Sequence, residues 1–170
     1  MAKAKRTKGR GGYVFFKELG GAARRSDLSK TARVLLEQGF VRGRVLDYGC
    51  GHGFDADAHG WGAFDPYYRP TPPTGPYDTI VVNHVANVLT RFARQKLFAD
   101  VDALLADGGV AYLSVARNIP LGGKMGARRR IQNHVVLTLT SVFCDQEEEI
   151  YAMPKGVVFQ DLTREFEERL

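Results

Sequence analysis

The sequence predicts an α/β protein with a mostly parallel β-sheet, and three observations lead to this prediction. Apolar runs typical of strands alternate with stretches whose apolar residues have helical spacing. Glycine-rich turns follow several of these runs. One run, Tyr77–Asn83, is almost continuously apolar, as expected for a strand buried on both faces of a sheet. We expect about six strands, of which the last two are antiparallel.

The first half of the chain supplies two short helices and three strands. A helix is expected over 30–38, because Ala32, Leu35 and Leu36 have helical spacing and Gly39 is suited to end it. A strand over 44–48, a helix over 54–59 and a strand over 61–65 follow. Residues 66–76 contain five prolines, which remove backbone donors, so no regular element is expected there.

The second half is expected to complete the sheet. An amphipathic helix over 90–106 precedes a buried strand over 110–116. A loop rich in glycine and arginine covers 118–130, and an antiparallel pair is expected over 135–142 and 149–153. The spacing of Phe159, Leu162 and Phe166 predicts a last helix over 157–170.

Length and composition indicate one soluble domain. The chain has 170 residues, of which 44% are hydrophobic and 25% charged, as in an average globular protein. No apolar run is long enough to span a membrane, and a cytoplasmic location is expected. The two cysteines exclude a disulfide framework and a four-cysteine metal site, and no metal site is expected. We divide the chain into a basic tail (1–12), one domain (13–156) and a terminal helix (157–170), which is a candidate dimer contact.

The net charge of +5 comes from the first ten residues. That segment has five basic side chains and no acidic one, whereas the other 160 residues contain 19 of each kind. Such a segment can bind nucleic-acid phosphates or simply remain solvated. Its basic residues are Lys3, Lys5, Arg6, Lys8 and Arg10.

The turn between the first strand and the next helix is the most informative stretch. In VLDYGCGHG, Asp47 ends a strand, and Gly49, Gly51 and Gly53 follow at a spacing of two. Glycine lets a ligand approach the backbone closely, and a helix N-terminus offers free N–H groups. A carboxylate at the end of the strand can hold an ammonium group.

A second acid, Asp65, lies 18 residues after Asp47 at the end of the next strand. From that place an acid bonds ribose hydroxyls in nucleotide-binding α/β folds. The spacing does not fit the G-x-G-x-x-G of dinucleotide sites, and the chain has no phosphate-binding P-loop string. S-adenosylmethionine fits better, because it carries an ammonium, a sulfonium and a ribose but no phosphate.

These motifs resemble those of class I S-adenosylmethionine-dependent methyltransferases. The resemblance rests on VLDYGCGHG, FDP, YDTIVVN and LLADGGVAYLSV, and it covers roughly residues 22–153. The strings DYGCGHGFDAD, FDPYYRP and NHVANVL are similar to a group of small, poorly characterised bacterial and phage methyltransferases. The resemblance implies a Rossmann-like fold and S-adenosylmethionine as cofactor.

The resemblance also implies roles for particular residues. Asp47 and the three glycines match the cofactor loop, Asp65 the ribose acid, and Asn83 a position that lines the methyl-transfer pocket. The family's usual third strand has no room before Tyr77, so we expect the loop with Pro66, Tyr67 or Tyr68 to close over the adenine in its place.

Two further features concern the methyl acceptor. His84, next to Asn83, is a candidate base for a proton of the acceptor, or an ordinary histidine at a strand end. Three adjacent arginines are a candidate phosphate or carboxylate clamp, or a solvated charged stretch. They are Arg128, Arg129 and Arg130.

The tail and the arginines favour nucleic acid as the acceptor. The alternatives are a methyltransferase for a small molecule or protein, and a non-catalytic module that binds S-adenosylmethionine. At the end of the strand Tyr77–Asn83, amino-methylating DNA enzymes carry the string D-P-P-Y. This chain has Asn83-His84-Val85 there, which argues against methylation of a DNA amino group.

Overall fold

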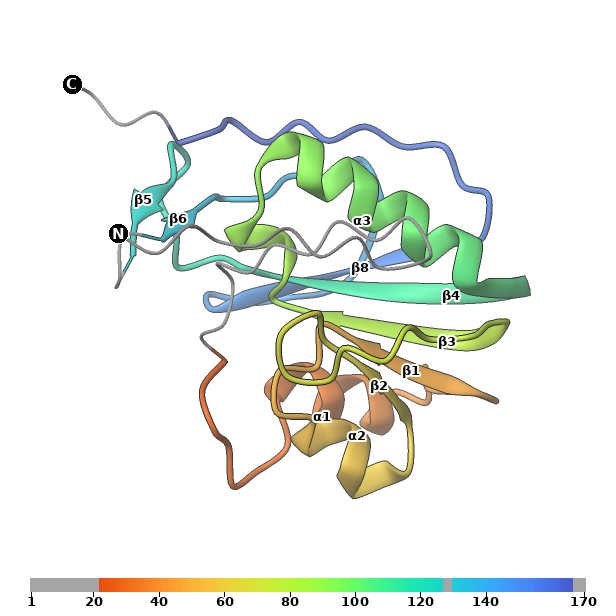
Figure 1. Ribbon diagram of the computed structural model, residues 1–170. Coiled ribbons are helices and arrows are strands. Elements are labelled where there is room, and N and C mark those ends of the chain that lie inside the picture. The colour runs from red at the N-terminus through yellow and green to blue at the C-terminus, as the bar shows by residue number, and fades with distance from the viewer. Residues whose placement is uncertain (1–21, 127–129, 167–170) are drawn as a thin grey trace, which may run out of the picture.

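The computed structural model describes residues 22–126 and 130–166, and its centre is a six-stranded sheet (Figure 1). The strand order is β2-β1-β3-β4-β8-β7. The first four are parallel to their neighbours, whereas β8 runs antiparallel to β4 and β7 antiparallel to β8. The strands span Val45–Tyr48 (β1), Gly62–Phe64 (β2), Tyr77–Asn83 (β3), Leu105–Ala116 (β4), Thr140–Cys144 (β7) and Glu148–Pro154 (β8). The predicted fold class and the antiparallel end of the sheet are thereby confirmed.

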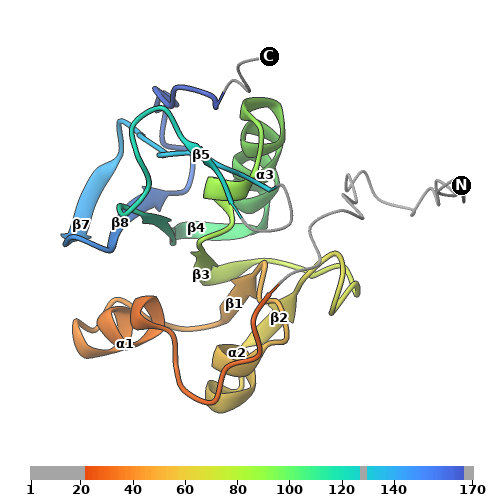
Figure 2. The same cartoon turned by 90° about the vertical axis from the view of Figure 1, so that its left-hand side faces the viewer.

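Helices cover both faces of this sheet (Figures 1 and 2). Helix α3 (Arg91–Leu104) lies on one face, and α1 (Lys30–Glu37) and α2 (Phe54–His59) lie on the other. Side chains alternate along β3 accordingly: Ile80 and Val82 pack in the core that includes α3, and Val81 packs in the core that includes α1. A short 3-10 helix, η1 (Ala86–Val88), connects β3 to α3.

The first half of the chain folds as the sequence predicts. Ser29 caps α1 by accepting a hydrogen bond from the Ala32 amide, and α2 and β3 have the expected bounds. Residues 66–76 form no strand, so β2 is an edge of the sheet and the family's usual third strand is absent, as expected. Here the chain makes only an isolated bridge between Asp65 and Arg69.

Three expectations for the second half are wrong. The strand expected over 135–142 begins only at Thr140, and Leu137 makes an isolated bridge to Asp161 instead. The loop expected over 118–130 contains β5 (Lys124–Met125), which pairs with β6 (Ile131–Gln132). No helix forms over the described part of 157–170, which ends at residue 166.

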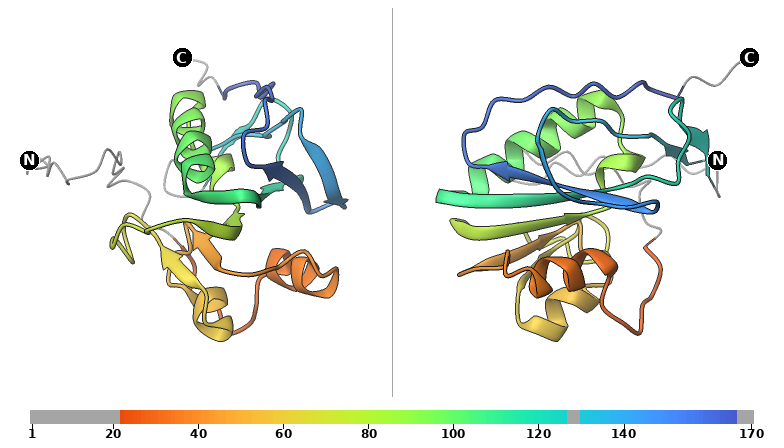
Figure 3. Two further views of the ribbon diagram at one scale, coloured as in Figure 1. Left: turned by 90° about the vertical axis from the view of Figure 1, so that its right-hand side faces the viewer. Right: turned by 180° about the vertical axis from the view of Figure 1, so that it is seen from behind.

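The C-terminal segment instead runs in an extended form along α3 (Figures 1 and 3). The reason is the guanidinium of Arg94, a residue of α3 that is fully buried. It bonds the carboxylates of Asp161 and Glu165, at 2.8 and 2.5 Å. A buried charge needs such partners, and here the C-terminal segment supplies them. No helix in the described residues is long and apolar enough to cross a membrane.

Candidate functional site

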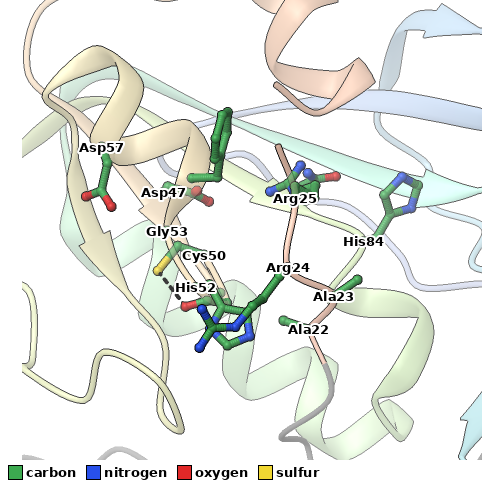
Figure 4. Close-up of a pocket in the computed structure, with 14 residues that line it drawn as sticks. Ala22, Ala23, Arg24, Arg25, Asp47, Cys50, His52, Gly53, Asp57 and His84 are labelled. Atoms are coloured by element: carbon green, nitrogen blue, oxygen red, sulfur yellow. Dashed lines mark hydrogen bonds between the residues drawn. The ribbon is translucent and has the colours of Figure 1, made fainter. Parts of the chain in front are cut away.

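A cavity of about 500 Å³ opens where β1 and β3 end at their carboxyl edge (Figure 4). In open α/β sheets this edge is the usual place for a ligand, and the volume suits a small molecule. The lining comes from the N-terminal segment, the glycine turn, the start of α2 and the end of β3. It consists of Ala22, Ala23, Arg24, Arg25, Asp47, Gly49, Cys50, Gly51, His52, Gly53, Phe54, Asp57, Asn83 and His84.

The three predicted glycines have left-handed backbone conformations, with φ of +83°, +56° and +84° for Gly49, Gly51 and Gly53. Their missing side chains make room for protein atoms. A Cβ at Gly49 would lie 2.3 Å from Val85, at Gly51 2.5 Å from Ala22, and at Gly53 2.4 Å from the Arg69 guanidinium. Neighbouring segments therefore pack closely against the turn, and glycine suits these positions in both conformation and space.

Asp47 lies at the wall of the cavity and is only 1% exposed. Among the residues that the structure describes, neither of its carboxylate oxygens has a hydrogen-bond partner. Burial, with the nearby charges of Asp55 and Asp65, raises the pKa of Asp47 to about 7, and Arg25 and Arg69 oppose this effect. A buried carboxylate without a partner is costly, so this position favours a ligand that brings a cation.

Residues 22–25 cross the glycine turn and help to enclose the cavity (Figure 4). They are anchored by Asp55 of α2, which is buried. Asp55 pairs with the Arg25 guanidinium at 3.1 Å and accepts a hydrogen bond from the Ser29 amide at 2.9 Å. The segment before α1 is thus tied to the helix that follows the turn.

Asp65 joins the glycine turn to the proline-rich loop. One carboxylate oxygen accepts from the Gly51 amide at 3.0 Å, and the other accepts from the amides of Tyr67 and Tyr68. Asp65 is not among the residues that line the cavity. Its role toward a ribose stays a prediction, and its role in the structure is to fix the turn.

The proline-rich loop approaches the cavity through Tyr68 and Arg69. The Tyr68 ring contacts the ring of His52 at 4.1 Å between centroids, and Arg69 donates to the His52 carbonyl and to Asp57. Tyr67 is 53% exposed to solvent. Closure of this loop over an adenine stays a prediction.

Asn83 and His84 lie together at the end of β3, as predicted. The side-chain oxygen of Asn83, Oδ1, accepts hydrogen bonds from the hydroxyls of Ser114 and Thr31, both at 2.9 Å. His84 has φ of +54°, which is uncommon for a residue other than glycine. Its amide donates to Ser114, and its Nε2 lies 3.0 Å from a carboxylate oxygen of Glu148.

Sequence reasoning missed Glu148, Thr31 and Asp55. Glu148 has a signal in the sequence, because strand alternation places it on the same face of β8 as the buried Ile150. An acid on that face needs a partner inside the protein. Thr31 and Asp55 have no such signal, since their roles depend on how α1 and α2 pack together.

Several predicted partner residues lie outside the described residues. These are the five basic residues of the tail and two of the three arginines, Arg128 and Arg129. Arg130 is described, stands directly before β6, and is not among the residues that line the cavity. Cys50 is buried in the turn, and burial raises the pKa of its thiol to about 12, which does not suit a nucleophile.

Comparison with known proteins decides the family. A family model described as a methyltransferase domain matches residues 21–137. The chain belongs to the methyltransferase domain family. This membership confirms the predicted methyltransferase, and its fold is the Rossmann-like one of similar solved structures. Two of those structures contain S-adenosylhomocysteine, the product of the expected cofactor. No curated protein matches the chain.

Solved structures of methyltransferases share the fold. One is the Burkholderia thailandensis 1,6-didemethyltoxoflavin-N1-methyltransferase, solved with its substrate and S-adenosylhomocysteine (14% identity, TM-score 0.53, 73% of this chain and 76% of that one). Another is the N-methyltransferase NodS from Bradyrhizobium japonicum, solved with S-adenosylhomocysteine (14%, 0.50, 75% and 87%). The PH0226 protein from Pyrococcus horikoshii is also similar (11%, 0.51, 72% and 86%).

Proposed function

We propose that this methyltransferase moves the methyl group of S-adenosylmethionine to a nucleophile that binds beside Asn83 and His84. The observation that carries the proposal is the carboxylate of Asp47, which is buried at the wall of the cavity with no hydrogen-bond partner in residues 22–126 and 130–166. An ammonium group there would form the charge-assisted hydrogen bonds that this carboxylate lacks. The bound cofactor supplies a methyl group activated by its sulfonium.

The residues around the cavity fit this cofactor. Asp47 would hold the amino group, and the backbone of the glycine turn would lie against the body of the molecule. Arg24 and Arg25 also line the cavity, on the segment that crosses the turn (Figure 4), and Arg24 would pair with the carboxylate of the cofactor. Asn83 and His84 mark the side from which an acceptor would enter. Holding both partners in line supplies much of the rate of such a displacement.

For the acceptor we propose nucleic acid, on the basis of the five positive charges in residues 1–10. A small molecule is the second candidate, because the structurally similar Burkholderia enzyme is solved with 1,6-didemethyltoxoflavin as its substrate. The two candidates differ in their salt dependence, since only a polyanion releases counterions on binding.

The test is formation of S-adenosylhomocysteine by the full chain from methyl-labelled S-adenosylmethionine. Separate reactions contain DNA, RNA, protein and a small-molecule extract, and the label is followed into each fraction. We expect label in the nucleic-acid fraction, falling as salt rises. Label only in the small-molecule fraction supports the second candidate. Tight cofactor binding with no transfer to any fraction would contradict catalysis and indicate a non-catalytic binding module.

A further inference from the structure

We infer that Glu148 is a positioning residue that fixes the imidazole of His84 so that its Nδ1 accepts the proton of the methyl acceptor. The inference rests on the proposed function and deepens it, because it limits the acceptor to an oxygen or nitrogen that still carries a proton. It stands on three observations: the burial of Glu148, the hydrogen bonds around it and the backbone of His84.

Glu148 is buried in β8, with 2% of its surface exposed. One carboxylate oxygen, Oε2, lies 3.0 Å from His84 Nε2 and 3.2 Å from the Thr31 hydroxyl oxygen, whose one proton is donated to Asn83. The other oxygen, Oε1, has no hydrogen-bond partner in the described part of the chain. A buried carboxylate is best satisfied by a donor, so His84 carries its proton on Nε2 and donates it to Glu148.

This bond determines the chemistry of the other ring nitrogen. With the proton on Nε2, Nδ1 of a neutral imidazole keeps a lone pair and can only accept. Within the described ranges Nδ1 has no hydrogen-bond partner, the side chain is 41% exposed, and His84 lines the cavity. The Nδ1 atom of His84 is therefore a free hydrogen-bond acceptor that solvent and ligand can reach.

The backbone of His84 is held in place independently of Glu148. Its φ of +54° lies in the left-handed region, which is uncommon for a residue with a side chain. The surroundings maintain it: the His84 amide donates to the Ser114 hydroxyl at 3.1 Å, and that hydroxyl donates to Asn83 at 2.9 Å. The ring is thus fixed at both ends, through its main chain and through Nε2.

The resulting step is balanced. The acceptor oxygen or nitrogen forms a bond to the methyl carbon, the carbon–sulfur bond breaks, and its electron pair stays on sulfur as a thioether. The acceptor's proton passes to Nδ1, which gives an imidazolium whose charge the Glu148 carboxylate stabilises. Since the ring is partly exposed, it returns this proton to solvent before the next turnover.

The inference is tested by the tautomer of His84 in the full chain labelled with ¹⁵N-histidine. Long-range ¹H–¹⁵N spectra are recorded at a pH where the ring is neutral, and His84 is assigned by its loss in His84→Gln. We expect a single tautomer protonated on Nε2, with the two nitrogen shifts far apart. A tautomer protonated on Nδ1, or shifts averaged between the two forms, in the parent chain would overturn the inference without any further variant.

Two variants extend this test. In Glu148→Ala the separation of the two shifts should be lost, whereas Glu147→Gln, at the exposed neighbour, should leave it unchanged. A fixed Nε2 tautomer that persists in a folded Glu148→Ala protein would also overturn the inference. Binding of S-adenosylhomocysteine is measured on the same samples: its absence in the parent chain would refute the proposed function, while the spectra still report on Glu148.

Discussion

At the residue scale, the site depends on a carboxylate that is placed where water cannot reach it well. Burial raises the pKa of Asp47 from 3.8 to about 7. The raised pKa means that the folded protein loses stability as the pH rises from about 4 to about 7, because Asp47 ionises in the unfolded chain over this range while it keeps its proton in the folded protein. A cation that binds to the ionised form recovers this loss, so that binding of the cofactor and ionisation of Asp47 are coupled.

This coupling predicts a pH-dependent affinity. Below pH 7, a bound ammonium must displace a proton from Asp47, so the affinity for S-adenosylhomocysteine should rise by up to ~tenfold per pH unit between about pH 5 and 7 and then level off. Calorimetry across this range measures it. In Asp47→Asn the affinity should be lower and nearly flat over the same range. A parent profile that is equally flat would show that Asp47 does not meet the cation.

The second prediction at this scale concerns the substitution of Gly51 in the glycine turn. In Gly51→Val the new Cβ would lie 2.5 Å from the Cβ of Ala22, and valine would have to adopt a φ of +56°. The turn and the segment that crosses it must therefore shift. We expect a destabilisation of about 1–3 kcal/mol and loss of S-adenosylhomocysteine binding.

Gly39→Val is the matched control for this variant, because Gly39 has φ of +69° with nothing within 4 Å. It should show a similar loss of stability with unchanged binding. If Gly51→Val binds S-adenosylhomocysteine as tightly as the parent, the glycine turn is not the cofactor site.

The residues of the turn were predictable because their spacing is local. One cavity is lined by Asp47, the three glycines, Asn83 and His84, because the carboxyl ends of parallel strands share one edge of the sheet. Glu148 was not predicted, because its contact with His84 joins residues 64 positions apart and depends on the register of β4 with β8. Asp65 was placed correctly at a strand end, but its three bonds to backbone amides depend on the loop that follows.

At the element scale, the C-terminal segment takes a place on α3 that its own sequence does not specify. The spacing of Phe159, Leu162 and Phe166 is helical, yet Leu162 is 53% exposed and Phe159 packs on Phe98 of α3. Periodicity describes only the segment itself. The buried charge of Arg94 lies elsewhere in the chain, and its need for two carboxylates outweighs the local preference.

Arg94→Met should therefore destabilise the protein strongly. The change leaves Asp161, whose side chain is 7% exposed, without its cation, and removal of one partner from a buried pair costs about 3–5 kcal/mol. Urea denaturation measures the change. Arg91→Met, which removes hydrogen bonds to two carbonyls of the same segment from an exposed position, should cost only about 1 kcal/mol. Equal losses in the two variants would refute the central role of Arg94.

At the scale of the whole molecule, the fold is a class I methyltransferase domain shortened at one edge. Proline composition predicted the missing strand, because five prolines within 66–76 leave too few donors for pairing. The sheet therefore ends at β2, and the loop that replaces the strand is tied back to the glycine turn by Asp65 and Arg69.

Charge is also distributed unevenly at this scale. Residues 11–170 contain equal numbers of basic and acidic side chains, so any affinity for nucleic acid must come from local clusters. Deletion of residues 1–10 removes five positive charges. If this segment binds phosphates, the slope of log affinity against log salt, measured with a labelled DNA or RNA, should flatten by up to ~4–5. An unchanged slope would favour the small-molecule acceptor.

The most direct test of the central claim is calorimetric titration of the full chain with S-adenosylhomocysteine and, separately, with NADH. We predict micromolar binding of S-adenosylhomocysteine, roughly −8 kcal/mol, and no binding of NADH. At pH 7.5, Asp47→Asn should weaken this binding, whereas Asp57→Asn, at the exposed rim of the same cavity, should change it little. Tight binding of NADH together with no binding of S-adenosylhomocysteine would contradict the assignment of the cavity.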